Sequence, residues 1–274
     1  MFKTLNKPLL ALALAGLAMH AQAHRPWMVP SSSMVEAKDA WVTVDAAISE
    51  DLFDIDHQPL KLDALEITGP DGARVPAANV MTGRLRSVFD VKMDKPGTYK
   101  AAIVSQNVMA SYKLNGEMKR WRGSEEALTK EIPAEAQEVK VTRMSSRLET
   151  FFSANSTNDA VFKPTGVGLE LVPLTHPNDL RTGEKATWRF LLDGKPAANQ
   201  AFSLVPGGVR YRGVLGEIRH STDAKGEITF VLPAAGMYFV STSWPAAAPT
   251  PAGQPPAQMP RRVSYTATVE VLPQ

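Results

Sequence analysis

Residues 95–104, with the sequence KPGTYKAAIV, indicate the fold class of this chain. Pro96 and Gly97 are typical of a turn, and the residues after them suit a strand whose Tyr99 points into a core. A similar stretch, AGMYFV at residues 235–240, lies in the second half of the chain, and a turn containing Asp and Gly precedes each copy. The recurrence predicts two related β-domains rather than one.

Short apolar-polar runs at intervals of about ten residues extend this pattern along the chain. We expect strands over 41–46, 65–68, 87–91, 139–152, 164–173 and 263–271. The charged segment 116–138 is expected to be a loop, with a short helix over 124–130 that Ser124 caps. The fold class is therefore all-β, with two Ig-like or transthyretin-like β-sandwich domains.

The expected domains follow from where these runs break. Residues 24–173 form the first sandwich, residues 174–179 the linker, and residues 180–274 the second sandwich. A stretch rich in Pro and Ala over 245–260 should be an extended loop of the second domain.

The first 23 residues have the pattern of a cleaved secretory signal peptide. Lys3 and Lys7 precede an apolar run over 8–19, and the segment ends in Ala21-Gln22-Ala23. The run is shorter than the roughly 20 residues that a membrane span needs. We expect a periplasmic protein without a membrane span, whose first residue after cleavage is His24.

Composition excludes several functional classes. The leader holds two of the 30 Lys and Arg residues and none of the 28 Asp and Glu residues, so the mature chain is formally neutral. A neutral chain without a basic cluster does not suggest nucleic-acid binding. Cysteine is absent, which excludes disulfides and thiolate sites. No nucleophile elbow or phosphate loop occurs, and we expect a protein that is not an enzyme.

His24 is the first candidate metal ligand. Once cleavage frees its amine, that amine and the imidazole can chelate one ion, and a second histidine would complete a site of three nitrogens suited to copper, nickel, zinc or iron. His57 is the second candidate, in the loop after the strand over 41–46, where Asp54 or Asp56 can support the imidazole or bind the ion directly. Against this stands a surface loop whose acidic residues only cap turns.

Other potential ligands have simpler interpretations. His176 lies in the linker and is expected to be structural, and His220 is expected to face solvent from a strand. Met28 and Met34 offer soft thioethers, although methionines near a terminus usually make hydrophobic contacts.

The second half resembles a transthyretin-like or carboxypeptidase-regulatory-like module. The residues that carry this likeness are 183–190, 193–198, 222–226 and 233–238. The mature chain as a whole resembles a periplasmic family of unknown-function domains, often labelled nickel or cobalt uptake accessory proteins of energy-coupling-factor transporters. Its matching features are His24 with Trp27 and Pro30, the segment 51–57, and the segment 167–174. The resemblance implies metal-ligand roles for His24 and His57.

Three functions remain open from the sequence. The first is a periplasmic protein that binds nickel, cobalt or copper through His24, His57 and Asp56 and passes it to a membrane transporter or an outer-membrane receptor. The second is a non-enzymatic adhesion or scaffold protein that binds a protein partner. The third is a copper oxygenase with a terminal-histidine chelate, which would need a flat aromatic surface from Trp27 and Trp41.

Overall fold

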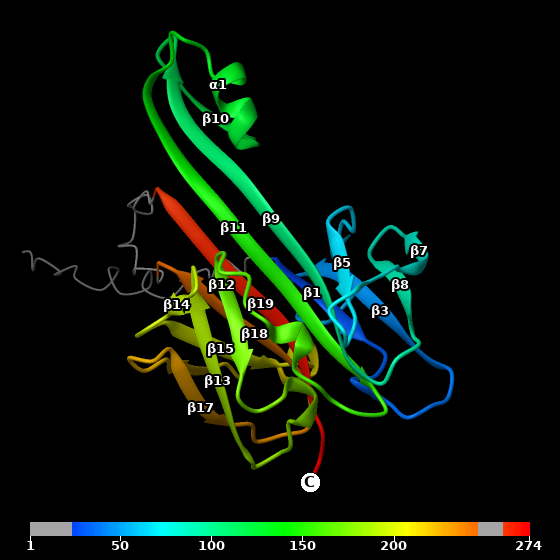
Figure 1. The fold of residues 1–274 in the computed structure, drawn as a ribbon. Helices are drawn as coiled ribbons and strands as arrows, with labels where there is room; N and C mark the ends of the chain where they lie inside the picture. The colour runs from blue at the N-terminus through cyan, green and yellow to red at the C-terminus, as the bar shows by residue number, and fades with distance from the viewer. Residues whose placement is uncertain (1–23, 246–259) are drawn as a thin grey trace, which may run out of the picture.

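The computed structural model describes residues 24–245 and 260–274, and strands make up most of this part (Figure 1). The all-β expectation is confirmed. The strands form three sheets, which together build a sandwich architecture. The expected signal peptide, and nearly all of the expected Pro- and Ala-rich loop, lie outside the described residues.

The first sheet has five strands and the third has four, and a ten-stranded central sheet lies between them. The first sheet consists of β1 (Arg25–Pro30), β3 (Ala40–Ser49), β4 (Gln58–Pro59), β7 (Ala78–Thr82) and β8 (Ser87–Met93). The central sheet consists of β2 (Met34–Val35), β5 (Leu65–Thr68), β6 (Arg74–Val75), β9 (Gly97–Leu114), β10 (Glu117–Gly123), β11 (Gln137–Ala154), β15 (Ala201–Pro206), β16 (Ile218–Ser221), β18 (Gly236–Trp244) and β19 (Arg261–Val271). The third sheet consists of β12 (Leu169–Pro173), β13 (Lys185–Leu192), β14 (Lys195–Pro196) and β17 (Glu227–Val231).

The first and third sheets pack on opposite faces of the central sheet. Successive side chains of a strand point to opposite faces, and β11 shows the consequence. Its Leu148 and Phe152 lie in the core formed with the first sheet, whereas its Phe151 lies in the core formed with the third sheet. Tyr99, the aromatic of the KPGTY stretch, is buried in the first of these cores, and Tyr238 is buried in the second.

The two halves of the chain share the central sheet. β19, the last strand, pairs in parallel with β11 from Arg143↔Arg261 to Thr150↔Thr268, and pairs on its other side with β18. Residues 169–173, assigned from the sequence to the first domain, pair with β13 of the second half. The expected linker holds the short helix η2 (Pro177–Asp179), in which Pro177 and Asn178 are buried. The two sandwiches are therefore built on one continuous sheet.

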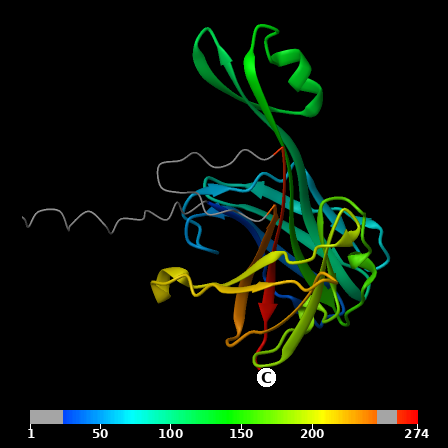
Figure 2. The same cartoon turned by 90° about the vertical axis from the view of Figure 1, so that its left-hand side faces the viewer.

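A third, smaller core fastens the first sheet to the second half. It contains Trp27 of β1 and Leu52 of the loop after β3, packed with Val205, Val209 and Phe239. Val209 begins the short helix α2 (Val209–Arg212), which projects from the body in Figure 2.

β9 and β11 extend beyond the body as a long arm (Figures 1 and 2). β10 pairs with the outer part of β9, so the segment expected as a loop contains a strand over 117–123. The expected helix is confirmed as α1 (Glu125–Glu131), and the Ser124 hydroxyl accepts a hydrogen bond from the Ala127 amide, as an N-cap should. None of the described helices has the length and hydropathy required to cross a membrane.

Candidate metal site

Three strand ends of the first sheet bring together His24, Glu50 and His57. In the register of β1 with β3, Arg25 lies opposite Ser49, so the residue before β1 meets the residue after β3. On the other side of β3, Gln58 of β4 lies opposite Ile48, which brings the residue before β4 to the same end. The three side chains therefore meet because of strand register.

The donor atoms of these three side chains are close to one another. His24 Nε2 lies 3.3 Å from Glu50 Oε1, and the rings of His24 and His57 stack with centroids 3.9 Å apart and planes 9° from parallel. One ligand atom from each of the three residues lies within 4.8 Å of the other two. The imidazole nitrogens of both rings are of the type that binds transition metals.

The donor set fits a divalent transition metal. Imidazole nitrogens and a carboxylate oxygen bind zinc at about 2.1 Å in tetrahedral geometry, so two ligands of one ion lie about 3.4 Å apart. The lone pairs of stacked imidazoles lie in parallel ring planes, so one ring must turn out of the stack before both nitrogens can bind one ion. Nickel, cobalt, copper(II) and zinc all accept such nitrogen and oxygen ligands.

The site is open to solvent. The side chain of His24 is 43% exposed and that of Glu50 is 63% exposed. Three protein ligands leave coordination positions free, unlike the closed four-ligand shell of a structural zinc site. An ion held here can therefore exchange with ligands from outside the protein.

Asp56, predicted as a ligand, does not join this group. Its Oδ1 accepts the amide of Glu50 at 3.1 Å, and its Oδ2 accepts the amide of Asp51 at 3.0 Å. Both carboxylate oxygens thus hold the start of the loop that carries Glu50. The side chain of Asp54, the other acidic candidate, makes no hydrogen bond with a described residue. Its backbone amide donates a hydrogen bond to the Asp51 carbonyl.

The loop between β3 and β4 is packed against the second half of the chain. Phe53, in the left-handed region at φ 68°, contacts Trp27 edge to face with ring centroids 5.8 Å apart. The Trp27 indole donates to Ser49 Oγ at 2.7 Å, at the end of β3. Phe53 also lies against Gly207, where an added Cβ would be 2.9 Å from the ring. Contacts with β1 and with the second half of the chain therefore hold the loop.

The remaining sequence candidates are not members of this cluster. His176 lies in the linker, where its Nδ1 accepts the Asn178 amide and its Nε2 contacts Thr98 Oγ1 at 2.9 Å, which agrees with the expected structural role. His220 is exposed on β16, as expected. Met28 is fully buried in the core beneath the first sheet, and Met34 lies on β2.

Sequence reasoning missed Glu50 as a member of the cluster. Four acidic residues lie between positions 50 and 56, and nothing in their order distinguishes a ligand from a turn residue. The distinguishing signal is the strand end: Glu50 directly follows β3, opposite the residue before β1. Pairing the two predicted strands would have been needed to find it.

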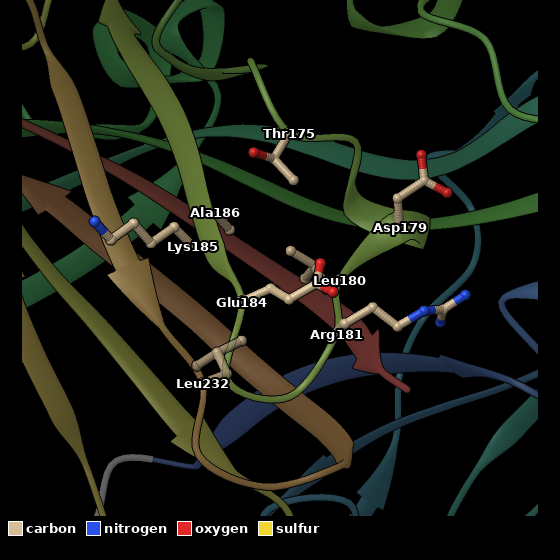
Figure 3. Close-up of a pocket in the computed structure, with 8 residues that line it drawn as sticks. All are labelled: Thr175, Asp179, Leu180, Arg181, Glu184, Lys185, Ala186 and Leu232. Atoms are coloured by element: carbon tan, nitrogen blue, oxygen red, sulfur yellow. The ribbon is translucent and has the colours of Figure 1, made fainter. Parts of the chain in front are cut away.

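A second hollow lies between η2 and β13 and does not form a comparable site. It is lined by Thr175, Asp179, Leu180, Arg181, Glu184, Lys185, Ala186 and Leu232. Arg181 Nη1 is buried there without a hydrogen-bond partner among the described residues. Figure 3 shows the side chains of Arg181 and Lys185 extending in opposite directions, while two carboxylates line the same hollow. The cations therefore do not converge on a common ligand.

Comparisons with known proteins identify a family without an assigned activity. The model of a family described as "Domain of unknown function (DUF4198)" matches residues 21–246. No curated protein matches the sequence significantly.

Three solved structures show distant likeness. A DUF4785 family protein from Legionella pneumophila has 10% identity and a TM-score of 0.25, over 78% of this chain and 50% of that one. Escherichia coli alpha-2-macroglobulin has 13% identity and a TM-score of 0.23, over 92% of this chain and 20% of that one. The D0-D1 domain of Intimin has 11% identity and a TM-score of 0.22, over 89% and 97%. This chain thus spans half or less of the first two, and none of the three carries a functional argument.

Proposed function

The chain belongs to the DUF4198 family, whose description assigns no activity, and we propose from the site itself that it is a periplasmic accessory protein for the uptake of a transition metal. The observation that carries the proposal is the meeting of His24, Glu50 and His57, whose donor atoms lie within 4.8 Å of one another. The cargo is a divalent ion of the nickel, cobalt or copper class, and Glu50 takes the ligand role that the sequence suggested for Asp56.

The exposure of the site supports transfer rather than storage. A partly exposed ion with free coordination positions can be taken over by a receiving protein, ligand by ligand. Cleavage before His24 would add a terminal amine beside its imidazole and raise the number of nitrogen donors to three. A membrane transporter or an outer-membrane receptor is the receiver that this function requires.

Native mass spectrometry of the exported protein tests the proposal. The chain is expected to begin at His24 and to retain one nickel, cobalt, copper or zinc ion, and His24→Ala, Glu50→Gln and His57→Ala should each lose it. His220→Ala is the matched control, since His220 is exposed on β16 and is not a member of the cluster. A Kd weaker than about 1 μM, roughly −8 kcal/mol, for all four metals would overturn the proposal.

The two competing functions make different predictions. A scaffold or adhesion protein would bind its protein partner equally well after His24→Ala and His57→Ala. A copper oxygenase would produce peroxide with copper and a reductant. That function has less support, because Trp27, which was expected to contribute to a flat aromatic surface, is only 2% exposed.

A further inference from the structure

The outer part of the arm has one covered face and one open face. Arg143 of β11 binds Glu125 of α1 through two hydrogen bonds, and Trp121 of β10 donates to Glu131 at the end of α1. The helix therefore covers the face to which these two side chains belong. On that face of β9, Val108 and Ala110 are buried, whereas Met109, between them in the sequence, is 40% exposed on the other face.

Strand register identifies the residues of the open face. Met109 lies opposite Arg122 of β10 and Thr142 of β11, and the next row consists of Arg120, Ser111 and Lys140. Residues opposite one another in a sheet point to the same side. The face also receives Met144, which is 37% exposed and lies opposite Arg262 of β19, and Met118, which is 61% exposed.

Positive charge on the open face is largely unpaired. Arg120, Arg122, Lys140 and Arg262 form no ion pair with any described residue. Lys113, also on this face, pairs with Glu138 at 3.7 Å. The carboxylates of Glu125 and Glu131 lie instead on the helix side. The cationic side chains on adjacent strand pairings of this face repel one another, because they lie within the Debye length of about 10 Å. Contact with an anionic surface would reduce this repulsion.

We propose that this open face of the arm, defined by Met109, Met118, Arg120, Arg122, Lys140, Met144 and Arg262, docks on an anionic lipid surface. Basic side chains near such a surface each contribute attraction, and flexible methionine side chains between them can enter the interface. A bilayer presents its headgroups as a continuous plane and needs no shaped pocket in the protein, which suits a sheet face of separate, extended side chains. The outer part of the arm projects beyond the sandwiches (Figures 1 and 2).

Vesicle co-sedimentation of the full exported protein tests this proposal independently of any metal. The protein is expected to sediment with vesicles of phosphatidylcholine mixed with phosphatidylglycerol, to release at high salt, and not to sediment with phosphatidylcholine alone. The pair Arg120→Gln and Arg122→Gln should weaken binding about 30-fold, from about 1 kcal/mol for each charge near the surface.

The control pair is Lys119→Gln and Lys130→Gln, which removes the same charge from the same arm but not from the open face. Lys119 belongs to the other face, where it lies opposite Tyr112, and Lys130 is on α1. The control should keep at least a third of the wild-type affinity. Equal loss in both pairs, or no binding to the anionic vesicles, would overturn the proposal, and an acidic protein surface would then be the alternative. Circular dichroism verifies that each variant is folded.

Discussion

The phenol of Tyr265 donates a hydrogen bond of 2.9 Å to Glu149, joining residues 116 positions apart in the sequence. Tyr265 lies on β19 and Glu149 on β11, so this bond crosses the parallel pairing that unites the two halves. Lys100 and Arg147 also approach the Glu149 carboxylate, at 3.6 and 3.4 Å. Burial, with the negative charge of Glu149 beside it, raises the pKa of Tyr265 well above its usual value.

Glu149→Gln is expected to destabilise the fold by about 3 kcal/mol, because it leaves the cations of Lys100 and Arg147 partly buried without their shared carboxylate. Tyr265→Phe removes only one hydrogen bond and should cost about 1 kcal/mol. Chemical denaturation measures both changes, and Glu66→Gln, at an exposed position of β5, provides the neutral control. A loss for Glu149→Gln no larger than that of the control would show that the charges are not coupled.

Asp56→Asn is expected to weaken metal binding by about tenfold without removing a ligand. One of the two oxygens that hold the amides of Glu50 and Asp51 becomes an amide nitrogen, so the loop carrying Glu50 loosens. Loss of groups that orient ligands typically costs 10- to 100-fold in metal affinity. Titration calorimetry with nickel or zinc gives the Kd, and Asp54→Asn is the control of equal charge. Similar affinities for the two variants would contradict a positioning role.

Gly226→Ala is expected to destabilise the second sandwich by more than about 2 kcal/mol. Gly226 has φ +74°, and an added Cβ would lie 2.5 Å from the Phe190 carbonyl oxygen and 2.9 Å from the Ala197 nitrogen, which are backbone atoms. Gly72 has φ +80° in the corresponding turn of the first half, but no atom lies within 4 Å of its added Cβ. Gly72→Ala should therefore cost about 1 kcal/mol, from backbone strain alone. Thermal unfolding of the two variants separates steric overlap from strain.

Stability is expected to fall as the pH drops below about 6.5, the ordinary value for histidine. Desolvation lowers the pKa of His176 in the folded protein, although Asp179 and Asp159 partly oppose this shift. The unfolded chain then binds a proton that the folded chain does not, so the contribution of His176 is complete above the unfolded value and is lost as the pH falls toward the folded one. Denaturation from pH 8 to pH 5 should show a flatter profile for His176→Gln than for the wild type, and equal slopes would contradict this prediction.

Much of the fold could be predicted from the sequence, because turns, helix caps and strand alternation depend on residues that are close together in the chain. The turn at Pro96 and Gly97, the cap at Ser124 and the alternating strands act over a few positions, and each appears in the structure. The parallel pairing of β11 with β19 could not be predicted in this way. No turn connects these strands, and their register is set by the two cores that cover them.

The same distinction applies to the candidate site. His24 was predicted from its position after the expected cleavage site, and His57 from its loop beside Asp54 and Asp56 together with the family resemblance. The membership of Glu50 in the cluster depends on how β1 aligns with β3. The role of Asp56 depends on which backbone amides donate hydrogen bonds to its carboxylate. Both are properties of three-dimensional register, which the spacing of acidic residues does not encode.

The position of β19 also determines when the molecule can be completed. Because the final strand lies between β18 and β11, a chain shortened before residue 261 leaves both neighbours without their partner. Assembly of the middle layer must therefore wait until residues 261–271 have been synthesised. Proteolytic removal of the last dozen residues would remove most of β19, and both β11 and β18 would lose their pairing with it. If either half were expressed alone, one of its strands would have an unpaired edge.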